Sequence, residues 1–141
     1  IGDKTRLAED LQASIPELEQ ATQNNIGLHF QIAINYGGRD ELRRAVTKLA
    51  EQVTAGTLKP EDIVEDSIAA QLDTAGLPDP DLLIRTSGEQ RISNFLLWQT
   101  SYAELYFTPV LWPDFDKNEL AKAVEVYQNR DRRYGLVKEE A

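Results

Sequence analysis

The sequence has no cysteine, no methionine and a single histidine among its 141 residues. Without cysteine, the chain has no disulfide, no thiol chemistry and no cysteine-ligated metal. No apolar run approaches the roughly 20 residues that cross a bilayer as a helix. Cations are also few, because 15 Lys and Arg stand against 24 Asp and Glu, a formal net charge of −9. Nucleic-acid binding needs a cationic surface, so this balance argues against a nucleic-acid partner.

The lack of methionine extends to position 1, which is Ile1. A reading frame starts with methionine, so we expect the sequence to be an internal or C-terminal piece of a longer protein. The length and the hydrophobic fraction of 41% still allow one domain with a core.

Strand-like and helix-like patterns alternate along the chain. Leu28, Phe30, Ile32 and Ile34 alternate with other residues and predict a strand at 28–36, and shorter apolar runs predict strands at 82–86 and 104–108. Helical spacing predicts further elements, at residues 40–55, 60–72, 94–100 and 116–129. This order predicts an α/β fold with an open, mostly parallel sheet flanked by helices.

The first helical region carries two capping signals. Asp3 is placed to cap a helix that starts directly after it. Pro16 interrupts the apolar repeat, so we expect a second helical piece near Pro16 with Ser14 as its cap.

The stretch "IRTSGEQRISNF", residues 84–95, gathers cations in an acidic protein. Arg85 leaves a predicted strand, Gly88 lets the backbone turn, and Arg91 returns toward the same edge. Ser93 adds a hydroxyl, and the predicted helix after it adds free backbone N–H groups. In open α/β sheets ligands bind beyond the carboxyl ends of strands, so this pattern predicts a phosphate or diphosphate site. An equally consistent interpretation is surface ion pairing of both arginines with Glu89, Asp79 or Asp81.

Other polar or aromatic features favour structural roles. "NYGGR", residues 35–39, is typical of a turn followed by a helix cap, and His29 sits in an apolar strand pattern without a partner pattern. "EDIVED", residues 61–66, contains paired acids but fits a solvated helix face better than a metal motif. The aromatic residues between 98 and 112 fit a core or a subunit interface better than a base-stacking surface.

The segment 81–115, "DLLIRTSGEQRISNFLLWQTSYAELYFTPVLWPDF", resembles the signature region of the cis-prenyltransferases, most closely the bacterial enzymes that make undecaprenyl diphosphate. "INYGGRDEL", residues 34–42, resembles the box that precedes it in that family. "RRYG", residues 132–135, resembles the family's C-terminal Arg-x-Gly element. The similarity runs along essentially the whole chain. It implies that residues 1–141 are the C-terminal part of a single cis-prenyltransferase domain.

This resemblance implies a Mg²⁺-dependent transferase that condenses isopentenyl diphosphate with an allylic diphosphate, usually farnesyl diphosphate. The product is a long cis-polyprenyl diphosphate, a membrane lipid carrier for cell-wall synthesis. The resemblance also implies a homodimer, a cytoplasmic location and transient contact with the inner face of the membrane.

The resemblance assigns roles to residues by their position. Glu104 matches a carboxylate that helps to hold Mg²⁺, and Glu89 matches a supporting glutamate. Arg133 and Gly135 would reach a diphosphate site, in many members that of the partner subunit, and Asn35 and Arg39 match site architecture. The full set of implied substrate-binding residues is Arg85, Arg91, Ser93, Arg133, Gly135, Asn35 and Arg39.

The family's principal catalytic aspartate lies in an N-terminal "MDGNGRWA"-type motif, and no such segment occurs in the 141 residues. We therefore expect the chain to carry the isopentenyl diphosphate site and much of the dimer interface, and to be inactive alone. An alternative is a non-catalytic partner subunit of a heteromeric cis-prenyltransferase, although Arg85, Arg91, Ser93 and Glu104 are all intact. A generic nucleotide-binding module should show a GxxxxGK or GxGxxG loop, and the sequence has neither.

Overall fold

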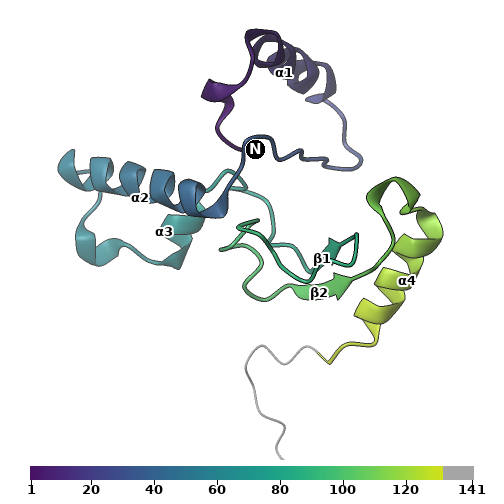
Figure 1. Ribbon diagram of the computed structural model, residues 1–141. Helices are drawn as coiled ribbons and strands as arrows, with labels where there is room; N and C mark the ends of the chain where they lie inside the picture. Colours follow the sequence, from purple (N-terminus) through teal and green to yellow (C-terminus); the bar gives the residue numbers. More distant parts are fainter. Residues whose placement is uncertain (132–141) are drawn as a thin grey trace, which may run out of the picture. The chain divides into compact units, whose positions relative to one another are not determined.

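The computed structural model describes residues 1–131, and the chain divides into two compact units, Ile1–Leu77 and Pro78–Ala141 (Figure 1). The first unit contains three α-helices, α1 (Glu9–Thr22), α2 (Gly38–Thr54) and α3 (Glu65–Ala69). The second unit contains strands β1 (Leu82–Arg85) and β2 (Glu104–Phe107) and helix α4 (Lys117–Gln128). Three short 3₁₀ helices complete the described elements, at Lys4–Arg6, Pro60–Asp62 and Trp112–Asp114.

Helix α1 runs without a break through Pro16, so the predicted second helical piece is wrong. Ser14 does not cap a helix; its hydroxyl donates to the carbonyl of Asp10 one turn earlier, at 2.9 Å. Proline removes one backbone hydrogen bond, and on this exposed helix water can solvate the carbonyl that is left over. The predicted cap at Asp3 is confirmed, because its carboxylate accepts the N–H of Thr5 at 3.0 Å at the start of the first 3₁₀ helix.

Helix α2 ends as the sequence predicts. Gly56 has φ of +72°, and the N–H groups of Gly56 and Thr57 return to the carbonyls of Val53 and Gln52. This double return is the Schellman motif, which favours glycine because other residues are strained in the left-handed region. The helical spacing also predicts one inward side, with Leu42, Val46, Leu49 and Val53. Leu49 is buried as predicted, but Val46 is 58% exposed, and Glu41 and Ala45 are buried as well.

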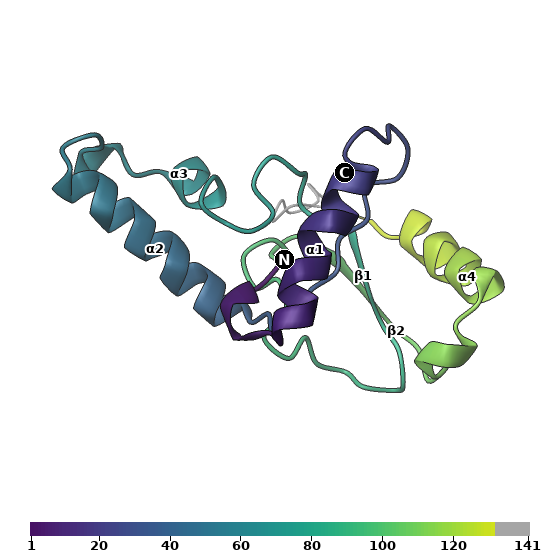
Figure 2. The same ribbon diagram turned by 90° about the horizontal axis from the view of Figure 1, so that it is seen from above.

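The predicted helix at 60–72 forms only in part. Residues 60–62 make a 3₁₀ turn, and α3 covers just Glu65–Ala69. Helix α3 lies beside α2 in both views (Figures 1 and 2). The acidic "EDIVED" segment, residues 61–66, is exposed, as expected for a solvated face.

The predicted strand at 28–36 is wrong for most of its length. Leu28 is 88% exposed and Phe30 77%, and within residues 1–131 the backbone of 26–31 has no hydrogen-bonded partner strand. Pairing begins only near its end, where Ile1 donates to the carbonyl of Ile32 at 2.8 Å and accepts from Ile34 at 3.0 Å. Alternation predicts which side chains would share a face, but a strand also needs a neighbour for its backbone groups.

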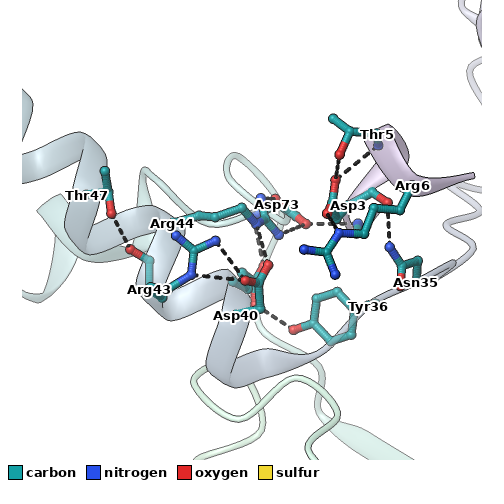
Figure 3. A network of polar contacts seen from close by, with 12 residues as sticks. Asp3, Thr5, Arg6, Asn35, Tyr36, Asp40, Arg43, Arg44, Thr47 and Asp73 are labelled. Atoms are coloured by element: carbon teal, nitrogen blue, oxygen red, sulfur yellow. Dashed lines mark hydrogen bonds and ion pairs between the residues drawn. The ribbon is translucent and has the colours of Figure 1, made fainter.

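A partly buried polar network joins α2 to two distant segments of the first unit (Figure 3). Asp73 makes two hydrogen bonds with the Arg44 guanidinium, at 2.7 and 2.8 Å, and accepts the N–H of Gly2 at 2.9 Å. Glu41, only 1% exposed, accepts the N–H of Asp73 at 2.8 Å and the hydroxyl of Tyr36 at 2.5 Å. These contacts fasten the chain start and the turn at residue 73 to the first turns of α2.

The Arg44 guanidinium holds the pKa of the Asp73 carboxyl below its ordinary value, and the Gly2 N–H acts in the same direction, while burial opposes both. A carboxyl whose folded pKa is lowered stabilises the fold above its unfolded pKa of about 3.9 and loses that contribution as pH falls through the folded pKa. We therefore expect the free energy of unfolding of the natural chain to fall more steeply below about pH 4 than that of Asp73→Asn. Urea unfolding followed by circular dichroism across pH 2–7 measures it, with exposed Asp62→Asn as the control. Parallel pH profiles for the natural chain and Asp73→Asn would contradict the expectation.

Strands β1 and β2 of the second unit pair in parallel, with Leu82 opposite Glu104 and Arg85 opposite Phe107. Both lie where the sequence predicts strands, each one residue shorter. Helix α4 packs against β2, and Asp116 caps it by accepting the N–H groups of Asn118 and Glu119 at 2.8 and 3.1 Å. The described elements are thus a parallel sheet with helices, and the predicted α/β class is confirmed.

Two details of the second unit differ from expectation. The predicted helix at 94–100 is not formed; this segment is a series of turns. Positive φ angles at Ser93, Asn94 and Leu96 prevent a regular right-handed helix there. The helical spacing at 116–129 predicts that Leu120, Val124 and Tyr127 face inward, but the buried residue of α4 is Ala123, and Leu120 and Val124 are 47% and 37% exposed.

Candidate functional site

The candidate site starts at the carboxyl end of β1, where Arg85 is the last strand residue. Its side chain is half-buried, and within residues 1–131 we find no hydrogen bond or ion pair that it makes. The predicted surface pairing with Glu89, Asp79 or Asp81 therefore does not occur for Arg85. A half-buried guanidinium at this end of a parallel strand is placed where α/β sheets bind ligands.

The loop after Arg85 is fastened to the chain that follows β2. The N–H of Ser87 donates to Val110 at 2.8 Å, and the N–H of Gly88 donates to Thr108 at 2.9 Å. Ser87 and Gly88 have φ of +68° and +69°. Successive left-handed residues turn the chain sharply, so the loop bends back at the carboxyl edge of both strands.

Arg91 and Glu89 lie on this loop and form an ion pair with each other. Their side chains are 61% and 40% exposed, so solvent and small anions reach the guanidinium. The predicted surface pairing of Arg91 with Glu89 is therefore confirmed, and since a guanidinium has five donors, Glu89 occupies only part of them. Glu89 can orient Arg91 without neutralising the cationic edge, because Arg85 adds a second charge.

Ser93 follows Arg91 on the same loop and is exposed. Its φ of +49° and that of Asn94, +64°, place two residues in the left-handed region in succession. The helix N-terminus that was expected to add N–H donors here is absent, because residues 94–100 form turns. Any anion at this loop would therefore depend on side chains and not on a helix dipole.

Glu104 lies elsewhere on the same sheet. It is the first residue of β2 and pairs with Leu82, three positions and about 10 Å along the strand from Arg85. Its carboxylate is 25% exposed and faces the Arg130 guanidinium at 3.8 Å. Arg130 follows α4 directly, and sequence reasoning missed it; its only signal was its place just before "DRRYG".

Asn35 and Arg39 belong to the first unit; Asn35 lies three residues before α2, and Arg39 is the second residue of that helix. Asn35 has φ of +49°, and its side-chain amide donates to the carbonyl of Asp3 at 2.9 Å. It lines a hollow of about 330 Å³ together with Asp3, Arg6, Tyr36, Gly37, Asp40 and Arg43 (Figure 3). Arg6 and Arg43 are already paired there with Asp3 and Asp40. Asn35 thus has a structural contact, in keeping with a role in architecture.

The remaining predicted residues, Arg133 and Gly135, lie outside the described residues. Among the residues described, no group of three or more histidine, aspartate or glutamate side chains gathers in a form that could hold a metal ion. No helix in the described part of the chain is both long and apolar enough to cross a membrane.

These features define a class of protein: an α/β fold that presents arginine side chains at the carboxyl end of a parallel strand. The family model described as "Putative undecaprenyl diphosphate synthase" matches residues 1–135. The chain therefore belongs to the undecaprenyl diphosphate synthase family of prenyltransferases, and the resemblance seen in the sequence is confirmed.

Individual relatives agree with this assignment. A ditrans,polycis-undecaprenyl-diphosphate synthase of Vibrio cholerae is 55% identical over 140 residues, 99% of this chain and 56% of that protein. An isoprenyl transferase of Rhizobium meliloti is 53% identical over 135 residues, 96% of this chain and 55% of that protein. The crystal structure of lavandulyl diphosphate synthase from Lavandula x intermedia, in complex with dimethylallyl diphosphate, matches with a TM-score of 0.93 and 47% identity over 96% of this chain and 58% of that one. The chain thus spans about half the length of the curated relatives that it matches.

Proposed function

We propose that this chain carries the isopentenyl diphosphate site of a cis-prenyltransferase. The enzyme condenses isopentenyl diphosphate with an allylic diphosphate, farnesyl diphosphate, to a long cis-polyprenyl diphosphate of the undecaprenyl type. The observation that carries the proposal is the half-buried Arg85, which has no ion-pair partner in residues 1–131 and ends a strand beside the Arg91 loop. The names of the relatives support the same chemistry.

The proposed binding residues are Arg85, Arg91 and Ser93. A diphosphate is a compact anion with many acceptor oxygens, and guanidinium groups bind such oxygens in pairs. Arg85 and Arg91 would neutralise the charge, and the Ser93 hydroxyl would donate to a further oxygen. Glu89 would hold Arg91 in place through its ion pair. Arg133 and Gly135 would add contacts from the C-terminal segment, and Asn35 and Arg39 would support the architecture.

Mg²⁺ is the proposed cofactor, and Glu104 is its proposed ligand. A single carboxylate fits a Mg²⁺ ion, which commonly keeps several waters and takes its remaining ligands from substrate phosphates. The described residues offer no larger cluster of acids, so Glu104 is the protein's contribution on this part of the chain. When bound, the ion would neutralise charge on the diphosphate oxygens.

The proposal includes a homodimer and a C-terminal role for residues 1–141 within one domain. Trp112 and Tyr102 are 74% and 68% exposed, and aromatic residues of this kind are enriched at protein interfaces. Trp112 stacks on Phe115 with ring centroids 6.4 Å apart. A cytoplasmic location with transient membrane contact would suit a lipid product. Turnover requires the catalytic aspartate that these 141 residues lack, so the isolated chain should be inactive.

The experiment is a calorimetric titration of inorganic pyrophosphate and isopentenyl diphosphate into the natural chain and into Arg91→Ala. A charge-assisted hydrogen bond contributes about 1.5–3 kcal/mol, so we expect about tenfold to a hundredfold weaker binding in the variant. Exposed Arg43→Ala removes an equal charge from another ion pair and should bind like the natural chain. A non-catalytic partner subunit would bind neither anion to begin with, and equal binding by Arg91→Ala would contradict the proposed site.

A further inference from the structure

The Glu104 carboxylate is faced by a cation that the family resemblance did not assign. Arg130 Nη1 lies 3.8 Å from Glu104 Oε2, and among residues 1–131 this is the ion pair that Glu104 makes. At 3.8 Å the contact is electrostatic and longer than a hydrogen bond. The side chains are 48% and 25% exposed, so small ions can reach both groups.

Both ends of this pair are held by the backbone around them. Glu104 begins β2, and its N–H donates to the carbonyl of Asp81 at 2.9 Å beside the Leu82 pairing. Arg130 follows the end of α4, and its N–H donates to the carbonyl of Tyr127 at 3.0 Å. Since α4 packs against β2, the position of Arg130 opposite Glu104 follows from the packing of two regular elements.

Helix α4 carries a second cation that serves as a comparison. Lys122 pairs with Glu119 on its own helix at 2.5 Å, and its side chain is 61% exposed. Its ion pair therefore lies within α4, whereas the ion pair of Arg130 joins the residue after α4 to β2. Arg130 lies two residues after the end of α4 and faces the carboxylate of Glu104 on β2.

We propose that Arg130 is a positioning residue for Glu104. The Arg130 guanidinium pairs with the Glu104 carboxylate until a divalent cation takes its place. This inference rests on the proposed function, in which Glu104 is a Mg²⁺ ligand. A guanidinium and a divalent cation compete for the same carboxylate oxygens, because both are attracted to its charge and repel each other. Arg130 thereby keeps the carboxylate from being unpaired before the cation arrives, and is released from it afterwards.

The test is the affinity of the chain for Mn²⁺, a spectroscopic substitute for Mg²⁺, measured by electron paramagnetic resonance with and without inorganic pyrophosphate. Removal of one positive charge near the ion should tighten Mn²⁺ binding by about three- to tenfold in Arg130→Gln at low salt. Arg130→Lys keeps the charge and should bind Mn²⁺ like the natural chain. Lys122→Gln is the matched control for loss of a cation on α4 and should leave the affinity unchanged.

The same substitution in a Glu104→Gln background separates a role through Glu104 from a general effect on charge. Because Glu104 is the proposed ligand, Glu104→Gln should bind Mn²⁺ only weakly, and if Arg130 acts through Glu104, adding Arg130→Gln does not raise that binding. Unchanged or weaker Mn²⁺ binding in Arg130→Gln, or an equal gain in the Glu104→Gln background, would overturn the role of Arg130. If the Arg91→Ala titration succeeds while Arg130→Gln changes nothing, only this inference fails. No measurable Mn²⁺ binding by the natural chain would overturn both it and the metal role of Glu104.

Discussion

Replacing both Arg85 and Arg91 by alanine is expected to weaken the binding of inorganic pyrophosphate by about 10²- to 10⁴-fold. Each guanidinium would give up charge-assisted hydrogen bonds to the anion, and the two losses add if the groups act separately. Removal of Arg91 also leaves the Glu89 carboxylate without its ion pair, which adds repulsion toward the ligand. Isothermal titration calorimetry at low salt measures the change, since screening weakens such contacts.

A matched double variant, Arg6→Ala with Arg43→Ala, makes the same change in net charge. Both arginines are exposed, at 84% and 65%, and each pairs only at the surface with a nearby aspartate. Surface pairs of this kind contribute roughly 0–1 kcal/mol, so the chain should stay folded. Pyrophosphate binding that falls equally in both double variants would mean that overall charge, and not a site at the end of β1, attracts the anion.

Replacing Glu41 by alanine is expected to destabilise the first unit by about 3 kcal/mol. Its carboxylate is 1% exposed and accepts hydrogen bonds from the Tyr36 hydroxyl and the Asp73 N–H. Truncation leaves both donors without this acceptor and opens a void beside α2. Hydrogen exchange of the α2 amides, together with urea unfolding followed by circular dichroism, measures the loss of stability.

Glu51→Ala is the control, since Glu51 is exposed on the same helix and its substitution should change stability by no more than about 0.5 kcal/mol. Adding Tyr36→Phe in the Glu41→Ala background should cost less than Tyr36→Phe alone, because the shared hydrogen bond is already lost. Equal costs in the two backgrounds would show that the Tyr36 contact does not contribute to the effect of Glu41.

The partly missed helices show where local pattern stops being sufficient. The segment 60–72 has helical spacing, yet only Glu65–Ala69 is α-helical, and five residues form too short a helix to be stable without packing. Residues 94–100 were expected to be helical, but Ser93, Asn94 and Leu96 lie in the left-handed region, which their residue types do not predict. The apolar strand pattern at 28–34 is present in the sequence, but within residues 1–131 only its end finds a backbone neighbour, where Ile1 pairs with Ile32 and Ile34.

The sequence by itself determined the elements whose signals are local. The parallel strands at Leu82 and Glu104, the cap at Asp116 and the glycine stop at Gly56 all follow from hydrophobic runs or from backbone groups within a few residues. The loop that follows β1 and carries Arg91 was also predicted, because a strand followed by Ser-Gly indicates a turn at the carboxyl end of that strand.

Only the tertiary structure decided which charged groups meet. It left Arg85 without an ion pair in residues 1–131, buried Glu41 beneath Tyr36 and Asp73, and brought Arg130 to Glu104 from 26 positions away. Sequence spacing does not predict such contacts, because the distance between the groups depends on how α2 packs against the turn at residue 73 and how α4 packs against β2. Ionic contacts across elements are consequences of packing, and packing is a property of the folded chain.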